Sequence, residues 1–462
     1  MLRAVASGAY PNLELPTALR AARLTGRDAG FATELTYGTL RLRGRYDPII
    51  AAAAGRPLAA IDDNVLDTLR LGVHQLLGMR VPAHAAVAQT VALARQVNGA
   101  GAAGFVNAAL RRVSERPLDE WLEIVAGDTA AAIQRLSVRE SHPEWIVKAL
   151  REALLGHGRS TRETVDADLA DLLAADNEAA AVSLVARPGW SAVAELTDAG
   201  ALPGRWAPTA ATVPGGDPGT IPAVRQRRAA VQDEGSQLVT LAFAATRVEG
   251  SPSAGGPRWL DLCAGPGGKA GLLAALALRD GASLVANEVS KHRAALVRQT
   301  LEPAFVAAPK GRIEVRVGDG REIGELEPAA YDRVLVDAPC TGLGALRRRP
   351  DSRWRRTPDD LAVLTRLQRE LLASAIDATR PGGVIGYVTC SPHLSETVYA
   401  VRDVIKRRTD VSLLDAADAL RDKGAAAIPG AASNGFVQLW PDVHGTDGMF
   451  LALLRKRPAP PA

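Results

Sequence analysis

The stretch WLDLCAGPGGKAGLLAALALRD (259–280) decides the fold, because it combines a short apolar strand, a glycine-rich turn and a helix. The same order of elements follows in ASLVANE (282–288) and KHRAALVRQTL (291–301). Further strands are predicted in IEVRVGD (313–319), YDRVLVDAP (331–339) and GGVIGYVTCS (382–391), and a helix over 358–379. Strands that alternate with helices predict right-handed βαβ units and a doubly wound, mainly parallel α/β sheet.

Ligands of such sheets bind beyond the carboxyl ends of the strands. Acidic, glycine-rich and cysteine-containing segments follow the predicted strands at these ends: Asp261–Lys269, Glu288, Asp319, Asp337–Cys340 and Thr389–Ser391. All three cysteines of the chain, Cys263, Cys340 and Cys390, therefore fall on one edge of the predicted sheet. Either they are small buried apolar side chains, or one of them is a nucleophile.

The rest of the chain predicts two further domains. Residues 1–117 show helical periodicity and no alternation of period two, which predicts an all-α domain. Residues 118–230 predict a connecting α/β domain, with a helix in HPEWIVKALREALL (142–155) and a strand in EAAAVSLVARPGW (178–190). The third domain, 231–462, opens with a predicted helix in GSQLVTLAFAA (235–245) and contains the strand–helix units.

The composition is that of a globular protein, with 47% hydrophobic residues in a chain of 462. No apolar run reaches the ~18 residues of a membrane span, and the N-terminus lacks the apolar segment of a secretory signal. Three cysteines without a CxxC pair argue against disulfides and structural zinc, and the scattered histidines suggest no metal site. We expect a cytoplasmic monomer without a metal ion. The net charge of +4 is compatible with a nucleic-acid partner.

The glycine-rich turn predicts a cofactor site at the start of a helix. It comprises Cys263, Ala264, Gly265, Pro266, Gly267, Gly268 and Lys269. Its spacing fits neither GxGxxG nor GxxxxGK[ST], so a dinucleotide or a triphosphate is not favoured. Acids follow the next strands: Glu288 is placed for the ribose hydroxyls, Asp319 for the adenine edge and Asp337 for a methylsulfonium. A positively charged adenosine derivative suits these acids, which favours S-adenosylmethionine, although each acid alone is also typical of a loop cap.

The segment RRRPDSRWRR (347–356) follows Cys340 and predicts RNA contacts. Guanidinium groups bind phosphates and an indole can stack on a base. The candidates are Arg347, Arg348, Arg349, Arg353 and Trp354. An arginine run is also typical of an ordinary solvated surface, and its place beside Cys340 is what favours the RNA interpretation.

Four segments closely resemble the RNA cytosine-C5 methyltransferases of the NOL1/NOP2/Sun family: DLCAGPGGK (261–269), DAPCTGLGALRRRPDSRW (337–354), VTCSPHLSE (388–396) and QLWPDVHGTDGMFLALL (438–454). TELTYGTLR (33–41) and GFVNAALRRV (104–113) look like the NusB-like RNA-binding domain of the bacterial RsmB (Sun, Fmu) branch. The resemblance implies a Rossmann-like catalytic domain, S-adenosylmethionine as cofactor and methylation of one cytosine of 16S ribosomal RNA.

Methylation of cytosine at carbon 5 explains why such an enzyme needs a cysteine nucleophile. Carbon 5 of cytosine is a poor nucleophile, and a thiolate that adds at C6 activates it. The residues alone do not say which cysteine attacks, since DNA cytosine methyltransferases use a Pro-Cys motif, which here is Cys340. The resemblance assigns attack to Cys390 in the Thr-Cys motif and product release to Cys340. Asp337 is then a candidate to hold the proton on the ring nitrogen, Lys269 to stabilise the charges of the site, and Cys263 is structural.

Other functions stay open at this point. A tRNA cytosine-C5 methyltransferase would keep the same fold and chemistry. A DNA enzyme is disfavoured because the chain has no Glu-Asn-Val motif. A non-catalytic RNA-binding protein with a degenerate methyltransferase domain is a third possibility, against which the intact Cys340, Cys390, Asp337 and glycine turn argue.

Overall fold

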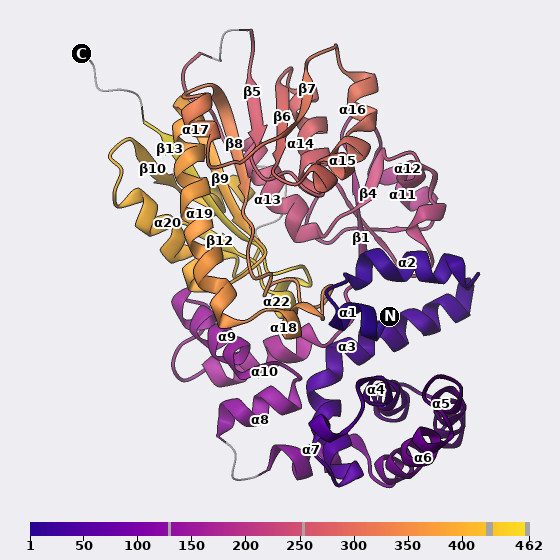
Figure 1. Ribbon diagram of the computed structural model, residues 1–462. Helices are drawn as coiled ribbons and strands as arrows, with labels where there is room; N and C mark the ends of the chain where they lie inside the picture. Colours follow the sequence, from indigo (N-terminus) through magenta and orange to yellow (C-terminus); the bar gives the residue numbers. More distant parts are fainter. Residues whose placement is uncertain (128–130, 252–254, 422–427, 458–462) are drawn as a thin grey trace. The chain divides into compact units, whose positions relative to one another are not determined.

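The computed structural model describes residues 1–127, 131–251, 255–421 and 428–457 (Figure 1). The chain forms two compact units. The first unit comprises residues 1–151, 166–179 and 346–356, and the second comprises residues 152–165, 180–345 and 357–462. The expected connecting segment 118–230 is therefore divided between the two units, and the arginine-rich segment belongs to the first one.

The described residues of the first unit form helices and connecting turns and contain no strand, as expected for 1–117. Its helices are α1 (Leu2–Ala6), α2 (Pro11–Ala21), α3 (Gly26–Ala54), η1 (Leu58–Ala60), α4 (Asp63–Leu77), α5 (Ala83–Asn98), α6 (Ala100–Ser114), α7 (Leu118–Ala126), α8 (Ala132–Arg139), α9 (Glu144–Gly156, up to Arg151), α10 (Val165–Asp176, from Asp166) and α18 (Ser352–Arg355). Local signals set their ends. The Asp62 carboxylate accepts from two amides at the start of α4, and Gly55 ends α3 in the left-handed conformation.

A small antiparallel sheet opens the second unit. Its strands are β1 (Val182–Ala186), β2 (Leu202–Pro203), β3 (Ala210–Val213) and β4 (Ala229–Val231), in the order β2-β3-β1-β4. The short helices α11 (Val193–Asp198), η2 (Pro218–Thr220) and α12 (Pro222–Arg225) accompany it. The strand expected within 178–190 is β1. The other three strands have two to four residues each, too few to show a period in the sequence.

The main sheet of the second unit matches the predicted strand–helix alternation. Its strands are β5 (Arg258–Asp261), β6 (Ser283–Glu288), β7 (Ile313–Val317), β8 (Tyr331–Asp337), β9 (Thr379–Thr389), β10 (Val411–Leu414), β11 (Ala432–Ser433), β12 (Phe436–Gln438) and β13 (Phe450–Lys456). The order is β11-β12-β13-β9-β8-β5-β6-β7, with β10 also on β13. Strands β7, β6, β5, β8 and β9 are parallel, which confirms the doubly wound sheet. The edge beyond β9 is antiparallel, a feature that the sequence did not indicate.

Helices cover both faces of this sheet (Figure 1). The core on one face includes α13 (Glu234–Ala245), α14 (Gly268–Arg279), α15 (Lys291–Thr300), α16 (Glu302–Ala307) and α21 (Ala416–Arg421). The core on the other face includes α17 (Ile323–Leu326), α19 (Pro358–Ala378) and α20 (Val398–Ile405). The short helices η3 (Leu394–Glu396) and α22 (Pro441–His444) lie in loops after β9 and β12. None of the helices in the described ranges combines the length and apolar character that crossing a bilayer requires.

Close packing of α13 on β9 gives a first testable prediction. A Cβ atom added at Gly386 would lie 2.5 Å from Cδ2 of the buried Phe243 ring. We expect Gly386→Ala to lower the free energy of unfolding by about 1–3 kcal/mol, because the ring must shift within a filled core. Urea unfolding followed by tryptophan fluorescence measures this. Gly215→Ala is the matched control, since no atom lies within 4 Å of its added Cβ. Equal midpoints for the two variants would contradict the packing.

Candidate active site

Two cysteine-bearing loops lie side by side at the carboxyl ends of β8 and β9. The strands are paired so that Asp337 lies opposite Val388. The amide of Ala338 donates to the carbonyl of Val388 at 2.9 Å, and the amide of Gly344 donates to the carbonyl of Cys390 at 2.9 Å. The Sγ atoms of Cys340 and Cys390 are consequently 3.4 Å apart, and both side chains are half-buried. The structure therefore brings together two thiols that are fifty residues apart in the sequence.

The two thiols differ in their electrostatic surroundings. The hydrogen bond to Cys390, followed by burial, raises the pKa of Cys340 well above its ordinary value. Cys340 is therefore a neutral thiol, which can donate a hydrogen bond toward the sulfur of Cys390. Burial also raises the pKa of Cys263 well above the ordinary value, so that Cys263 stays a neutral thiol.

An ion pair lies beside the cysteines. Nζ of Lys269, at the start of α14, is 3.0 Å from Oδ2 of Asp337 at the end of β8. Burial lowers the pKa of Lys269, but the negative charges of Asp337 and Cys390 outweigh burial and the pKa is raised overall. Lys269 is therefore a cation that can stabilise a thiolate at Cys390. Burial and the charge of Asp337 raise the pKa of the neighbouring Asp261 to about 8.

The glycine turn packs against the end of β6. The amide of Gly265 donates to Oε2 of Glu288 at 3.0 Å, and the amide of Ser290 donates to Oε1 at 2.9 Å. A Cβ atom at Gly265 would lie 2.2 Å from the same Oε2, so a larger residue here would have to displace the Glu288 carboxylate. Gly267 has a φ of 117° where the turn enters α14, and open space lies beside Gly268.

Comparisons with known proteins agree with this geometry. A family model described as 16S rRNA methyltransferase RsmB/F matches residues 252–455, and the NusB family model matches residues 1–115. A Mycobacterium tuberculosis protein named "Putative methyltransferase Rv1407" is 50% identical over 98% of this chain and 94% of its own. Ribosomal RNA small subunit methyltransferase B of Pseudomonas putida is 32% identical over 90% of this chain and 89% of its own. The chain belongs to the RsmB/F family of methyltransferases.

A solved structure supports the fold of this RsmB/F methyltransferase. The crystal structure of PH0851 covers 96% of this chain and 93% of its own, with a TM-score of 0.74 and 22% sequence identity. The expected architecture is thus confirmed, with a helical NusB region followed by a mainly parallel methyltransferase sheet.

RsmB/F proteins are S-adenosylmethionine-dependent RNA methyltransferases, and the edge of the sheet fits that cofactor. The open space beside Gly268 leaves room for a ligand against the turn. Each oxygen of the buried Glu288 accepts one amide hydrogen bond, and Oε2 also lies 3.6 Å from Nη2 of Arg293. Oε1 is therefore the oxygen with a lone pair left for a hydroxyl. The residues that would hold the cofactor are the turn 263–269, Glu288 and Asp337.

The carboxylate of Asp319, for which a contact with adenine was predicted, is hydrogen-bonded to Arg321. Its carboxylate accepts from Nε of Arg321 at 3.0 Å, from Nη2 at 2.6 Å and from the Arg321 amide at 2.9 Å. These bonds lower the pKa of Asp319. A contact with adenine stays a prediction, and it would have to share the carboxylate with Arg321.

The sequence interpretation missed the buried groups that support the cysteine loops. Glu396 and Gln368 are both fully buried and contact the turn that contains Cys340. Glu396 lies in the segment VTCSPHLSE, quoted above for its family resemblance. Its position just before the apolar helix α20 was the signal that could have pointed to it. Gln368 lies in the middle of α19, and no local pattern distinguishes it.

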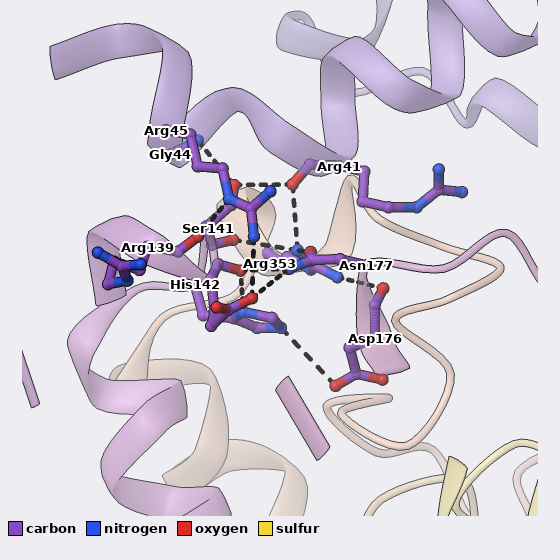
Figure 2. Close-up of polar contacts among 10 residues, drawn as sticks. Arg41, Gly44, Arg45, Arg139, Ser141, His142, Asp176, Asn177 and Arg353 are labelled. Atoms are coloured by element: carbon purple, nitrogen blue, oxygen red, sulfur yellow. Dashed lines mark hydrogen bonds and ion pairs between the residues drawn. The ribbon is translucent and has the colours of Figure 1, made fainter. Parts of the chain in front are cut away.

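Arg353, in the arginine-rich segment, is not available for the RNA contact expected of it. Figure 2 shows its guanidinium surrounded by acceptors of the first unit. Nη1 donates to the carbonyls of Arg41 and Ser141 at 3.0 and 3.1 Å and to Oδ1 of Asn177 at 2.7 Å, and Nη2 donates to the carbonyl of Asp176 at 2.6 Å. Arg353 is 0% exposed. A phosphate cannot reach it, so its assignment to RNA was wrong.

The remaining members of the segment keep their predicted role only as predictions. The indole of Trp354 donates to the carbonyl of Leu40 at 3.0 Å, and its half-buried ring has the Arg43 guanidinium 5.7 Å from the ring centroid. Arg347 and Arg348 are half-buried, whereas Arg349 is exposed. Of the five candidates, Arg349 offers the guanidinium that RNA can reach most freely.

The burial of Arg353 predicts a strong effect on stability. Arg353→Met leaves three carbonyls and one amide oxygen without their donor, so we expect a loss of about 3 kcal/mol or more in the free energy of unfolding. Urea unfolding followed by circular dichroism at 222 nm measures the helical first unit. The control is Arg349→Met, which removes an exposed arginine of the same segment and is expected to change stability by about 0.5 kcal/mol or less. Equal effects would show that the buried network does not stabilise the unit.

Proposed function

We propose that this RsmB/F methyltransferase methylates carbon 5 of one cytosine in 16S ribosomal RNA, with Cys390 as the nucleophile. The observation that carries the proposal is the 3.4 Å pair of Cys340 and Cys390 beside the cofactor turn. The substrate is supported by the matching family model and by relatives named ribosomal RNA small subunit methyltransferase B. The NusB region supports an RNA partner as well.

The first half of the reaction forms a covalent bond to the base. The Cys390 thiolate, stabilised by Lys269, adds to C6 of the cytosine. A sulfur lone pair forms the Sγ–C6 bond, and the C5–C6 π electrons are displaced toward C5, which becomes nucleophilic. The ring nitrogen takes up a proton from water during addition, and the Asp337 carboxylate accepts a hydrogen bond from the resulting N–H and holds that proton in place. C5 then takes an electrophilic methyl group, which S-adenosylmethionine would supply when bound, and the electrons of the broken S–CH3 bond would stay on the cofactor's sulfur.

The second half of the reaction releases the product. The C5 proton passes to water at this partly exposed edge, the C5–C6 double bond forms again, and the Sγ–C6 bond breaks with its electrons returning to sulfur. The proton on the ring nitrogen also returns to water. The protonated Cys340 donates to the departing sulfur and stabilises its negative charge. A cytosine in a helix must leave its stack to reach the two thiols.

Trapping of the covalent intermediate tests the proposal. Wild type, Cys340→Ala and Cys390→Ala are incubated with S-adenosylmethionine and unmodified 16S rRNA and separated on a denaturing gel. We expect adduct to accumulate in Cys340→Ala and to be absent in Cys390→Ala. The reverse pattern would assign the attack to Cys340. Adduct with tRNA but not with 16S rRNA would show that tRNA is the substrate. Adduct with neither RNA would favour an RNA-binding protein without this chemistry.

The charge of Lys269 predicts a shift in the pH dependence of thiol reactivity. Because a nearby cation lowers the pKa of a thiol, we expect Lys269→Met to raise the pKa of Cys390. Alkylation of Cys390 by iodoacetamide then slows near neutral pH and recovers at high pH, as quantified for the Cys390 peptide by mass spectrometry. Lys291→Met, an exposed lysine of α15, is the control. An unchanged pH profile in Lys269→Met would contradict the role of the ion pair.

A further inference from the structure

The turn that contains Cys340 is held from both sides by buried side chains. Nε2 of Gln368, in α19, donates to the carbonyl of Pro339 at 2.8 Å. The amide of Thr341 donates to Oε1 of Glu396, in η3, at 2.8 Å. The residues before and after Cys340 are thus each fixed by a hydrogen bond to a side chain that has no solvent exposure.

Glu396 is the centre of this arrangement. Besides the Thr341 amide, its carboxylate accepts from the Thr341 hydroxyl and from Nε2 of Gln368 at 3.1 Å. Its own carbonyl accepts from the hydroxyl of Tyr387 at 2.7 Å, which fixes η3 to β9. A carboxylate that is fully buried and saturated with donors holds its partners rigidly, because each lost bond would leave a desolvated charge.

The arrangement also reaches the loop of the second cysteine. Oγ1 of Thr341 is 3.2 Å from Oγ of Ser391, the residue after Cys390. Glu396 therefore contacts Thr341, the residue after Cys340, and through Thr341 it is connected to Ser391, the residue after Cys390. The hydrogen bond with Cys390 and burial raise the pKa of Cys340 most, and the charge of Glu396 acts in the same direction. Both effects keep the proton on Cys340.

We propose that Glu396 is a positioning residue for product release, which holds Cys340 so that its thiol faces the sulfur of Cys390. This inference rests on the proposed function, in which Cys390 attacks and Cys340 assists release. Glu396 acts through the main chain of Thr341. Its loss should impair the step that needs Cys340 and leave the attack by Cys390 comparatively intact.

The test separates formation of the covalent adduct from its release. Glu396→Gln keeps the size of the side chain but removes the charge and forces one oxygen acceptor to become a donor. We expect a slower turnover by about tenfold to a hundredfold, with adduct to 16S rRNA accumulating on a denaturing gel as in Cys340→Ala. The single-turnover rate of adduct formation should change by less than about threefold. Glu325→Gln, an exposed glutamate of α17, should match wild type.

Folding is controlled independently. Circular dichroism reports whether Glu396→Gln keeps its native fold. If it does not, Thr341→Val carries the test, because it removes the hydroxyl that contacts Glu396 and Ser391 and keeps the amide bond to Glu396. The same accumulation of adduct is expected, to a smaller extent.

Three outcomes decide between the two proposals. Adduct in Cys340→Ala and in Glu396→Gln supports the positioning role. Adduct in Cys340→Ala but not in folded Glu396→Gln overturns this inference and leaves the proposed function standing. Absence of adduct in Cys340→Ala overturns the proposed roles of the cysteines, and the positioning role with them.

Discussion

The active site depends on the register of β8 against β9. These parallel strands pair Asp337 with Val388, so the two loops leave the sheet next to each other and place Cys340 beside Cys390. Side chains alternate between the faces of a strand, and a shift of one residue would turn each apolar side chain to the wrong core. Val336 contributes to the core on one face, and its neighbour Leu335 to the core on the other. The catalytic geometry is therefore fixed by apolar packing on both faces of the sheet.

The charge of the site follows from the same arrangement. The ends of β5, β6 and β8 bring Asp261, Glu288 and Asp337 to one edge, where Lys269 is the cation that pairs with Asp337. The negative charge is crowded there, since burial and Asp337 together raise the pKa of Asp261 to about 8. A ligand with a positive charge relieves this crowding, whereas a phosphate would increase it. The acids thus favour a cofactor with a positive charge, such as the sulfonium of S-adenosylmethionine, over a nucleotide with a phosphate chain.

The sequence predicts those parts of the molecule that local patterns determine. Strand–helix alternation is such a pattern, and it placed the parallel strands and the edge that contains the three cysteines. The strands β2, β3 and β4 have no such pattern, because they are two to four residues long and are formed by pairing. Glu396 and Gln368 could not be assigned for a similar reason. Their role depends on α19 and η3 approaching the Cys340 turn from distant parts of the chain.

Arg353 shows why a high local arginine content does not by itself predict an RNA-binding surface. Six arginines in ten residues predict a basic surface, but a guanidinium has five donors in a planar fork and can be buried wherever acceptors surround it. The carbonyls of Arg41, Ser141 and Asp176 supply such a site, and burial lowers the pKa of Arg353 to about 9. The chain therefore passes from the catalytic unit into the first unit only a few residues after Cys340, and returns at Thr357. Glu396 and Gln368 hold the turn that contains Cys340 and belong to the same unit as this turn. The position of Cys340 is therefore fixed by contacts other than those of the arginine-rich segment.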